Sequence, residues 1–439
     1  MKVLKFGGTS VGSAQRMKDV AKLITDGEQK IVVLSAMSGT TNTLVEISDY
    51  LYKKNPEGAN EVINKLEAKY KQHIEELYST EEYKQKTLEF VKSVFDYIRS
   101  YTKDIFTLFE EKVILAQGEI ISTNMVTNYL CEQGVKATLI PALEFMRTDK
   151  NSEPDLTYIR EKLAIQLEAN PDYEIYITQG FICRNAYGEI YNLQRGGSDY
   201  TASLIGAAVN ASEIQIWTDI DGMHDNDPRI VDKTSPVRQL HFEEAAELAY
   251  FGAKILHPTC VQPAKYANIP VRLLNTMEPT APGTLISNET EKGKIKAVAA
   301  KDNITAIKIK SSRMLLAHGF LRKVFEIFES YQTAIDMVCT SEVGVSMSID
   351  NTKHLNEIVD DLKKYGTVTV DHDMCIVCVV GDLEWENVGF EAKALDAMRD
   401  IPVRMISFGG SNYNISFLIR EADKKKALQS LSDALFNNK

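Results

Sequence analysis

The sequence predicts an α/β fold: an open, mostly parallel sheet with helices on both faces and a helical insertion, followed by two nested ferredoxin-like α+β domains. Three observations lead to this prediction. Short β-branched segments alternate with helical patterns and glycine-bearing turns through about the first 290 residues. A lysine- and glutamate-rich stretch at about 57–112, without glycine after Gly58, interrupts this alternation. An α-β-β-α pattern then occurs twice in the C-terminal part.

The composition indicates a large soluble protein and narrows the range of its partners. The chain has 439 residues, enough for two or three domains of roughly 150 residues, and is 44% hydrophobic and 25% charged. A formal net charge of −11 argues against a nucleic-acid or anionic-membrane binder, which needs a basic face. No apolar run approaches the roughly 18–20 residues of a membrane span. Six scattered cysteines form no disulfide framework, so we expect a cytoplasmic protein.

The N-terminal segment predicts a β-α-β unit of a parallel sheet. Two short β-branched strands, at 3–6 and 31–35, flank a helical pattern at 13–26. Within the stretch 57–112, apolar residues recur at helical spacing, which predicts a helical insertion. Strand and helix alternation then resumes, with strands expected at 137–140, 174–181, 214–219 and 271–273. The charged stretch 287–296 ends this part of the chain.

The C-terminal repeat predicts two copies of one small domain. Gly319-Phe320 and Gly389-Phe390 each open a helical pattern, which two strands and a second helix follow. We expect these strands at 334–340, 343–349, 403–408 and 414–419, and the second helices at 353–362 and 422–435. With a strand at each end, such a unit is the β-α-β-β-α-β motif.

The number of strands predicts how the two copies are connected. The second copy has no room for a closing strand before the chain ends, whereas a spare strand, 304–310, precedes the first copy. We therefore expect this spare strand to close the second copy. The first copy, 313–372, would then be nested within a second copy made of 303–311 plus 373–439.

One cysteine pair has the spacing of a metal or redox motif. Cys375 and Cys378 lie in the apolar run 374–380, which predicts a buried strand. On a strand, residues three apart face opposite sides, so the two sulfurs diverge. No second cysteine or histidine pair lies nearby to complete a zinc site. We predict that the pair belongs to the core and that the chain has no metal site of its own.

The first glycine-rich turn is a candidate phosphate loop. Lys5-Phe6-Gly7-Gly8-Thr9-Ser10 ends the first strand and enters a helix. Glycines let backbone N–H groups approach a phosphate, and Lys5 lies at the carboxyl end of a strand, where open α/β sheets place ligands. It is not a Walker A loop, because Ser13 stands where the lysine is required. An ordinary turn with a surface lysine explains these residues equally well.

Four other segments could carry chemistry, and each has a structural alternative. Arg195-Gly196-Gly197-Ser198-Asp199 opens a small-residue helix and could hold a carboxylate, or could be a capped glycine turn. The acidic turn from Thr218-Asp219 to His224 and Arg229 could hold a nucleotide, or could be a solvated loop. Lys254 alone reads more readily as a surface residue than as a phosphate ligand. Glu119 could accept an ammonium group or be a helix-breaking polar residue.

Taken together, the motifs resemble those of the aspartate kinases. The segments are KFGGTSV, VVLSAMSGTTN, QGE, RGGSDYTA, WTDIDG with DPR, and FGAKILHP, in this order. The resemblance covers the whole chain. It implies an amino-acid-kinase domain at 1–297, with the insertion at 57–112, and a regulatory region at 298–439 made of two nested ACT domains. The length is similar to that of the monofunctional members.

The resemblance implies an enzyme. It would transfer the γ-phosphoryl group of ATP to the β-carboxylate of L-aspartate, giving 4-phospho-L-aspartate, the first step of lysine, threonine and methionine biosynthesis. ATP would arrive as its Mg²⁺ complex, with no permanently bound cofactor. The carboxylate needs no base, so the site should supply positive charge and N–H donors around the transferring group.

The resemblance also assigns roles to single residues. The catalytic residues would be Lys5, Asp199 and Lys254. L-Aspartate would be held by Ser35, Thr41, Glu119, Arg195, Gly196, Gly197 and Ser198, with Arg195 on its carboxylate and Glu119 on its amino group. ATP would be held by Lys5, Gly7, Gly8, Ser10, Thr218, Asp219, His224, Arg229, Lys254 and Ile255. His224 stands where many relatives have tyrosine.

ACT pairs in this family bind an end-product amino acid across a dimer interface, so a homodimer or a dimer of dimers is expected. The effector positions would be Met314, Ala317, Gly319, Phe320, Leu321, Ile335, Asp336, Thr340, Ser341 and Glu342. An ammonium group could bind Asp336 or Glu342, and a carboxylate could bind the helix start at Gly319. Leu316, Ala317 and Ala334 stand where lysine-sensing relatives often have polar residues. We expect lysine as the effector, with threonine or the lysine–threonine pair as the alternative.

Two rival functions follow from the same residues. A related enzyme could phosphorylate glutamate, carbamate or a nucleoside monophosphate, but the C-terminal repeat and the SGTTN and RGGSDYTA segments argue against it. The chain could instead be an amino-acid sensor with an inactive kinase domain. That would require a broken site, whereas the residues assigned to catalysis are all present.

Overall fold

The computed structural model describes residues 1–439 except 104, 194–195, 253–256, 312–317 and 437–439. It divides into two compact units. The first unit contains Met1–Met223 and Ile255–Asn288, and the second contains His224–Lys254 and Glu289–Lys439. The segment 224–254 thus packs with the C-terminal part of the chain. The predicted domain boundary at 297/298 stays a prediction.

The first unit is built on a mostly parallel sheet, as predicted. Its strands lie in the order β3-β4-β2-β1-β7-β9-β10, and only β10 runs antiparallel to its neighbour within this unit. The bounds are β1 Lys2–Phe6, β2 Lys30–Leu34, β3 Ala137–Leu139, β4 Ile175–Gln179, β7 Ile214–Thr218, β9 Val271–Asn275 and β10 Thr284–Ser287. A separate hairpin joins β5 Ile182–Arg184 to β6 Ile190–Asn192.

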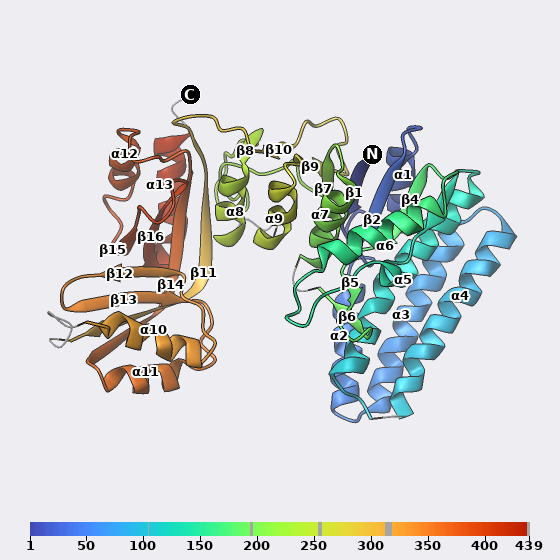
Figure 1. Cartoon of the computed structure of the whole chain (residues 1–439), viewed down its shortest axis with the longest axis horizontal. Helices are drawn as coiled ribbons and strands as arrows, with labels where there is room; N and C mark the ends of the chain where they lie inside the picture. Colours follow the sequence, from blue (N-terminus) through green and yellow to red (C-terminus); the bar gives the residue numbers. More distant parts are fainter. Residues whose placement is uncertain (104, 194–195, 253–256, 312–317, 437–439) are drawn as a thin grey trace. The chain divides into compact units, whose positions relative to one another are not determined.

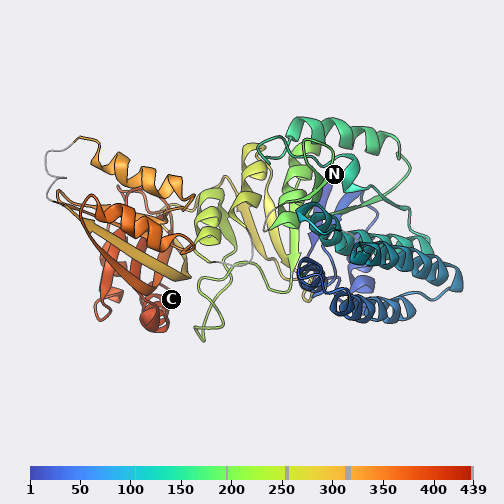
Figure 2. The same ribbon diagram turned by 90° about the horizontal axis from the view of Figure 1, so that it is seen from below.

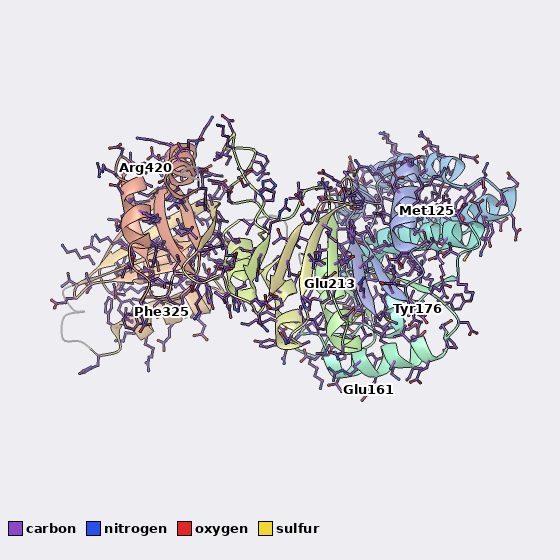
Figure 3. All side chains as sticks on the ribbon, turned by 90° about the horizontal axis from the view of Figure 1, so that it is seen from above. Met125, Glu161, Tyr176, Glu213, Phe325 and Arg420 are labelled. Carbon is purple, nitrogen blue, oxygen red and sulfur yellow. The ribbon has the colours of Figure 1, made fainter. Side chains whose placement is uncertain are left out.

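Helices cover both faces of this sheet. One face carries α1 Ala14–Ile24, α2 Thr40–Tyr52 and α5 Leu108–Glu132, and the other carries α6 Leu156–Glu168, α7 Gly197–Val209 and α9 Pro258–Tyr266. Figure 3 shows Met125 of α5 and Glu161 of α6 on opposite sides of the sheet. The predicted insertion is two long helices, α3 Pro56–Leu77 and α4 Glu81–Ser100, which pack beside α2 and α5 (Figures 1 and 2). Short 3₁₀ turns lie at Tyr101–Lys103 and Ala142–Glu144.

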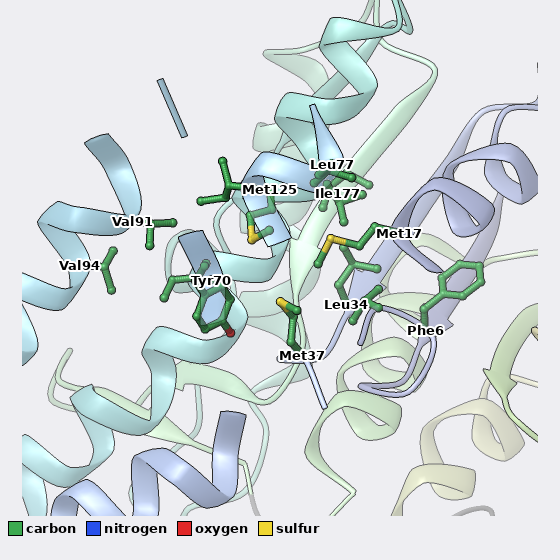
Figure 4. Close-up of a cluster of buried hydrophobic side chains, with 14 of the residues drawn as sticks. Phe6, Met17, Leu34, Met37, Tyr70, Leu77, Val91, Val94, Met125 and Ile177 are labelled. Carbon is green, nitrogen blue, oxygen red and sulfur yellow. The ribbon is translucent and has the colours of Figure 1, made fainter. Parts of the chain in front are cut away.

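The largest core of the first unit lies between the sheet and the α1–α5 layer. It includes Phe6, Met17, Leu34, Tyr70 and Met125, which are labelled among the side chains of this cluster in Figure 4. Strand side chains alternate between faces, and on β1 both Leu4 and Phe6 enter this core. Lys5 therefore points to the other face, the one that α7 covers. The alternation of side chains along β1 thus places Lys5 against α7.

The second unit contains an antiparallel sheet with the strand order β12-β13-β11-β14-β16-β15. The strands are β11 Ile295–Lys310, β12 Met337–Thr340, β13 Gly344–Ile349, β14 Thr367–Gly381, β15 Val403–Ser407 and β16 Asn414–Arg420. Its helices are α8 Phe242–Tyr250, α10 Phe320–Ser330, α11 Leu355–Lys363, α12 Phe390–Ala397 and α13 Lys424–Leu435, with the short strand β8 Gln239–His241 and a 3₁₀ turn at Glu421–Asp423. In Figure 1 the pairs α10–α11 and α12–α13 lie at opposite ends of the long strands.

The nesting of two ferredoxin-like copies is confirmed, but the predicted closing strand is wrong. Residues 304–310 of β11 pair with β13 and with the first half of β14, so this strand belongs to the first copy. The second copy is closed by 295–301, which pair with the second half of β14 beside β16. The prediction failed because the charged stretch 287–296 hid the start of one long strand. Asn303 (φ 59°) and Asp373 (φ 54°) mark the point where both long strands pass from one copy to the other.

Each copy has its own apolar core. The first copy buries Ile307, Phe320 and Val324 among others, and the second buries Cys375, Phe417 and Leu428. Cys375 belongs to this second core whereas Cys378 is buried outside it, so the structural role predicted for the pair is confirmed. Among the described residues, the structure contains no helix of sufficient length and apolarity to cross a bilayer.

Candidate active site

The described part of the first unit contains a pocket of about 370 Å³ at one edge of the sheet. Parallel strands end at the same edge, and here the ends of β1, β2, β4 and β7 are level: Phe6 pairs with Leu34 and Trp217, and Leu34 pairs with Gln179. The predicted residues that line the pocket are Lys5, Gly8, Ser35, Thr41, Glu119, Gly196, Gly197, Ser198 and Asp199. Segments far apart in the chain are therefore brought together at the predicted place.

Lys5 and Asp199 form an ion pair in this pocket. The distance from Lys5 Nζ to Asp199 Oδ1 is 2.6 Å, and the side chains are only 11% and 13% exposed. Asp199 lies in the first turn of α7, which faces the side of the sheet to which Lys5 points. Asp199 Oδ1 has no well-aligned hydrogen bond, so the contact is mainly electrostatic. A cation held in this way can stabilise negative charge that develops on a transferring group.

The loops after β1 and β2 are in direct contact because Gly8 has no side chain. A methyl group on Gly8 would lie 2.8 Å from the carbonyl oxygen of Ala36. The Ser38 N–H donates to the Gly8 carbonyl at 3.1 Å, which ties the two loops together. Gly196 has a similar role before α7, where its φ of 76° and the proximity of His257 exclude a side chain. Gly8, predicted to bind phosphate, and Gly196, predicted to bind the substrate, thus also allow the close contacts that hold these loops in place.

Glu119 of α5 is an unpaired carboxyl group at the base of the pocket. It is 3% exposed, and Oε1 accepts a hydrogen bond from the Ala36 N–H at 3.2 Å. Oε2 is buried without a hydrogen-bond partner. Burial raises the pKa of Glu119 to about 8. A carboxyl group in this state is suited to an ammonium ligand, which would complete its bonding and lower its pKa.

Two predicted ATP-binding residues, Gly7 and Ser10, are not among the residues that line the pocket. Ser198, which does line it, packs against Gly180 after β4. Gly7 is the first residue of the loop after β1, and its N–H donates to the Trp217 carbonyl. Ser10, by contrast, is fully buried, and its hydroxyl shares a hydrogen bond of 2.7 Å with Thr276. The Ser10 side chain therefore supports the loop and does not line the pocket.

The predicted nucleotide residues are divided between the two units. In the first unit, Thr218 ends β7 and Asp219 directly follows it and is exposed. His224 and Arg229 belong to the second unit, where His224 Nδ1 is 2.8 Å from Thr234 Oγ1. Arg229 donates from Nε and Nη2 to the two carboxylate oxygens of Asp227. This pairing lowers the pKa of Asp227 and raises that of Arg229.

The predicted effector residues lie in the first ferredoxin-like copy. Gly319 precedes α10 with a φ of 81°, Phe320 is buried, Leu321 is more exposed, and Ile335 packs against the core. Thr340, Ser341 and Glu342 are exposed around the β12–β13 turn. Asp336 is already engaged: Oδ1 accepts from Tyr250 Oη and Lys301 Nζ, each at 2.8 Å.

Several predicted residues lie outside the described residues: Arg195, Lys254, Ile255, Met314 and Ala317. Sequence reasoning also missed residues that the structure places at the sites. Met37, Asn42 and Phe181 line the pocket, and only the first two lie in a segment that carried a motif. Tyr250 at the end of α8 and Lys301 on β11 meet Asp336 only through the tertiary fold, and no local sequence signal marks them. No cluster of three histidine, cysteine or acidic side chains that could hold a metal exists among the described residues.

Comparisons with known proteins agree with this geometry. Residues 1–275 match the amino acid kinase family, and residues 377–435 match an ACT domain. The chain is 35% identical to aspartokinase 1 of Arabidopsis thaliana, over 99% of this chain and 80% of that protein. It is similar to the crystal structure of E. coli aspartokinase III with aspartate and ADP, at 31% identity and a TM-score of 0.87, covering 99% of this chain and all of the other. The structure of the same enzyme with lysine and aspartate gives 32% identity and a TM-score of 0.80, covering 99% of each chain.

Proposed function

Because the chain belongs to the aspartokinases, within the amino acid kinase family, and is an ATP-dependent kinase with ACT domains, we propose that the 370 Å³ pocket binds L-aspartate and the γ-phosphate of ATP. The observation that carries the proposal is the buried Lys5–Asp199 ion pair in one pocket with the unpaired carboxyl group of Glu119. Lys5 suits the negatively charged phosphoryl group that is transferred, and Glu119 suits the ammonium group of the substrate.

The proposed reaction is a direct transfer. A β-carboxylate oxygen of aspartate forms a bond to the γ-phosphorus, and the bond from that phosphorus to the β–γ bridging oxygen breaks. The products are 4-phospho-L-aspartate and ADP. No proton is removed, so Asp199 positions Lys5 and does not act as a base. Lys5 and the Gly8 N–H would offset the charge of two anions brought together, whereas the Gly7 N–H already donates to the Trp217 carbonyl.

Substrate selection would depend on two charged contacts. Glu119 would receive the ammonium group, and Ser35, Thr41, Gly196, Gly197 and Ser198 would line the remainder of the pocket. Arg195, outside the described residues, would hold the α-carboxylate through its planar guanidinium. ATP would contact Thr218 and Asp219, with His224, Arg229, Lys254 and Ile255 supplied by other segments.

Magnesium would be bound with the nucleotide rather than by a cage of protein ligands. The described residues offer no cluster of three acidic, histidine or cysteine ligands, and Mg²⁺ commonly keeps waters and substrate phosphates as ligands. Mg²⁺ would neutralise phosphate charge when bound. The residues of this chain would then position the acceptor carboxylate against the γ-phosphate.

The test is kinase activity with acceptor discrimination. The purified chain with Mg-ATP and L-aspartate should release ADP and form an acyl phosphate that hydroxylamine traps as a hydroxamate. L-Glutamate, carbamate and nucleoside monophosphates should be poor acceptors. Preference for one of these would replace the substrate assignment, and turnover of none would favour a sensor with an inactive kinase domain.

We further propose that an amino acid inhibits the enzyme through the ACT region, with lysine as the effector and homodimers or dimers of dimers as the working assembly. The crystal structure of the E. coli relative with lysine supports lysine. Asp336 supplies a carboxylate whose Oδ2 is buried and has no hydrogen-bond partner. Titration of activity with lysine and threonine, separately and together, tests this. Inhibition by threonine alone, or only by the pair, would replace lysine.

A further inference from the structure

Asp336, the carboxylate proposed to receive an effector's ammonium group, already binds an ammonium group of this chain. Lys301 Nζ lies 2.8 Å from Asp336 Oδ1 and 3.0 Å from Asp350 Oδ2. The Asp336 side chain is 1% exposed, and that of Lys301 is 18% exposed. The internal lysine and the proposed ligand therefore have the same chemistry and need the same carboxylate.

The charged groups around Lys301 lack one positive charge for neutrality. Two carboxylates, Asp336 and Asp350, face one ammonium group. Burial would lower the pKa of Lys301, but the two carboxylates hold it above its usual value, so Lys301 stays charged. Burial and the neighbouring Asp336 raise the pKa of Tyr250 to about 12, so Tyr250 stays neutral. The cluster has a net charge of −1, and Asp336 Oδ2 is buried without a partner.

Tyr250 connects this cluster to the segment that precedes Lys254. Its hydroxyl donates to Asp336 Oδ1 at 2.8 Å, and Lys301 Nζ lies 4.4 Å from the centroid of its ring. Tyr250 is the last residue of α8, and Gly252 lies two residues later, after the C-cap residue Phe251. A methyl group on Gly252 would lie 2.2 Å from the Ala300 carbonyl oxygen, so this turn is fitted closely to β11 next to Lys301. Any movement of Lys301 or Asp336 therefore acts on the turn directly before a proposed ATP-binding residue.

We infer that Lys301 is an internal competitor of the effector: its ammonium group holds Asp336 in the active state, and the effector's ammonium displaces it toward Asp350. Tyr250, which contacts both Lys301 and Asp336, transmits the exchange to the turn at 250–252 and so to ATP binding. This inference rests on the proposed inhibition by an amino acid through Asp336. If the effector bound Asp336 without displacing Lys301, its binding and its inhibition would change together. Competition predicts instead that removing Lys301 strengthens binding of the effector while weakening inhibition by it.

The experiment compares binding with inhibition in matched variants of the full chain. In Lys301→Met, the Kd of L-lysine measured by calorimetry should fall by roughly 5- to 150-fold, the usual range of coupling between two sites. The KM for ATP of this variant should respond less to L-lysine than that of the wild type. Lys301→Arg keeps the charge and should remain within about threefold of wild type in both measurements. Lys308→Met, an exposed lysine on the same strand, is the control.

Tyr250→Phe separates transmission from competition. It removes only the hydroxyl, so the Kd of L-lysine should stay near the wild-type value while the rise in the KM for ATP becomes smaller. If Lys301→Met is unstable, Tyr250→Phe still tests the inference, and its activity without effector shows that Tyr250→Phe itself is folded.

The outcomes separate this inference from the effector assignment. Wild-type inhibition by L-lysine, with unchanged or weaker binding in Lys301→Met, would overturn the competition. Inhibition that changes only the KM for aspartate would overturn the route through Tyr250. If wild-type enzyme binds no L-lysine, the effector assignment fails, and tight L-lysine binding gained by Lys301→Met would still support the competition; no gain would overturn it as well.

Discussion

Glu119 is a single carboxyl group whose burial determines what it can bind. Its Oε2 has no partner, its Oε1 accepts one backbone hydrogen bond, and its pKa is raised to about 8. An acid with a raised pKa in the folded state favours folding below its unfolded pKa, and this contribution is lost as the pH rises through about 8. A substrate ammonium group reverses the preference, because it favours the ionised form.

We therefore expect the affinity for L-aspartate to depend on pH through Glu119. Below pH 8 the free carboxyl group is protonated, so binding an ammonium must release a proton. kcat/KM for L-aspartate should rise with pH up to about 8, by at most about tenfold per unit. Glu119→Gln should lower kcat/KM and flatten this rise. A steep rise that persists in Glu119→Gln would contradict the assignment.

Lys5 offers a test of charge stabilisation with a control on the same strand. Lys5→Met should lower kcat by about 10²–10³-fold, the cost of losing one donor to a transition-state anion, with a smaller effect on both KM values. Lys2, also on β1, pairs with Glu28 at the surface, and Lys2→Met should leave kcat unchanged. Steady-state kinetics measure both, and circular dichroism checks the fold. An equal loss of kcat in the two variants would show that Lys5 has no specific role in phosphoryl transfer.

At the scale of elements, helix α5 fixes the position of the loop that follows β2. A methyl group on Gly118 would lie 2.7 Å from Ala36 Cβ, and the neighbouring Glu119 accepts from the Ala36 N–H. The Ser122 hydroxyl also donates to the Ser35 carbonyl at 2.8 Å. The small residues at this crossing allow a helix and a loop to hold one wall of the pocket together.

Gly118→Ala should therefore impair activity although alanine favours helices. The added methyl would push the Ser35–Ala36 backbone away from Glu119, and kcat/KM for L-aspartate should fall by at least about tenfold, since small misplacements are costly in catalysis. Gly410→Ala, where an added methyl meets nothing within 4 Å, is the control and should behave as wild type. Normal kinetics in Gly118→Ala would show that the loop can move without loss.

The elements also show what the sequence could predict. Periodicity alone located β1, β2, the insertion helices and both C-terminal copies, because these elements bury one regular face. It misassigned β11, since pairing over some 75 residues leaves no local pattern, and the charged start of that strand resembled a linker. Motifs identified Lys5, Glu119 and Asp199 for the pocket, whereas Lys301 and Tyr250 meet Asp336 only through the tertiary fold.

At the scale of the whole chain, the segment 224–254 links kinase motifs to the second copy of the regulatory domain. Val231 is buried in the core of that copy, the Val298 N–H donates to the Asp225 carbonyl, and Asn226 donates to the carbonyl of Leu428. His224 and Arg229, both proposed to hold ATP, lie in the same segment. Packing inside the regulatory unit should thus influence the nucleotide.

Val231→Ala should therefore affect both stability and ATP use. It removes two buried methyl groups, and the free energy of unfolding should fall by about 0.5–3 kcal/mol. The KM for ATP should rise, while that for L-aspartate stays near the wild-type value. Val345→Ala, in the core of the first copy, is the matched control, with a similar loss of stability and an unchanged KM for ATP. Equal effects of the two variants on ATP would contradict a specific role for the segment.

The long strand β11 has a consequence for synthesis on the ribosome. Residues 295–301 emerge early, but Lys301 pairs with Ile376, which is made 75 residues later. At about 5–20 residues per second, this apolar strand waits some 4–15 s for its partner. The first copy, whose strands lie between 304 and 371, is complete in the meantime. A premature stop codon shortly after residue 372 would therefore preserve the strands of the first copy and leave 295–301 as an unpaired, aggregation-prone strand.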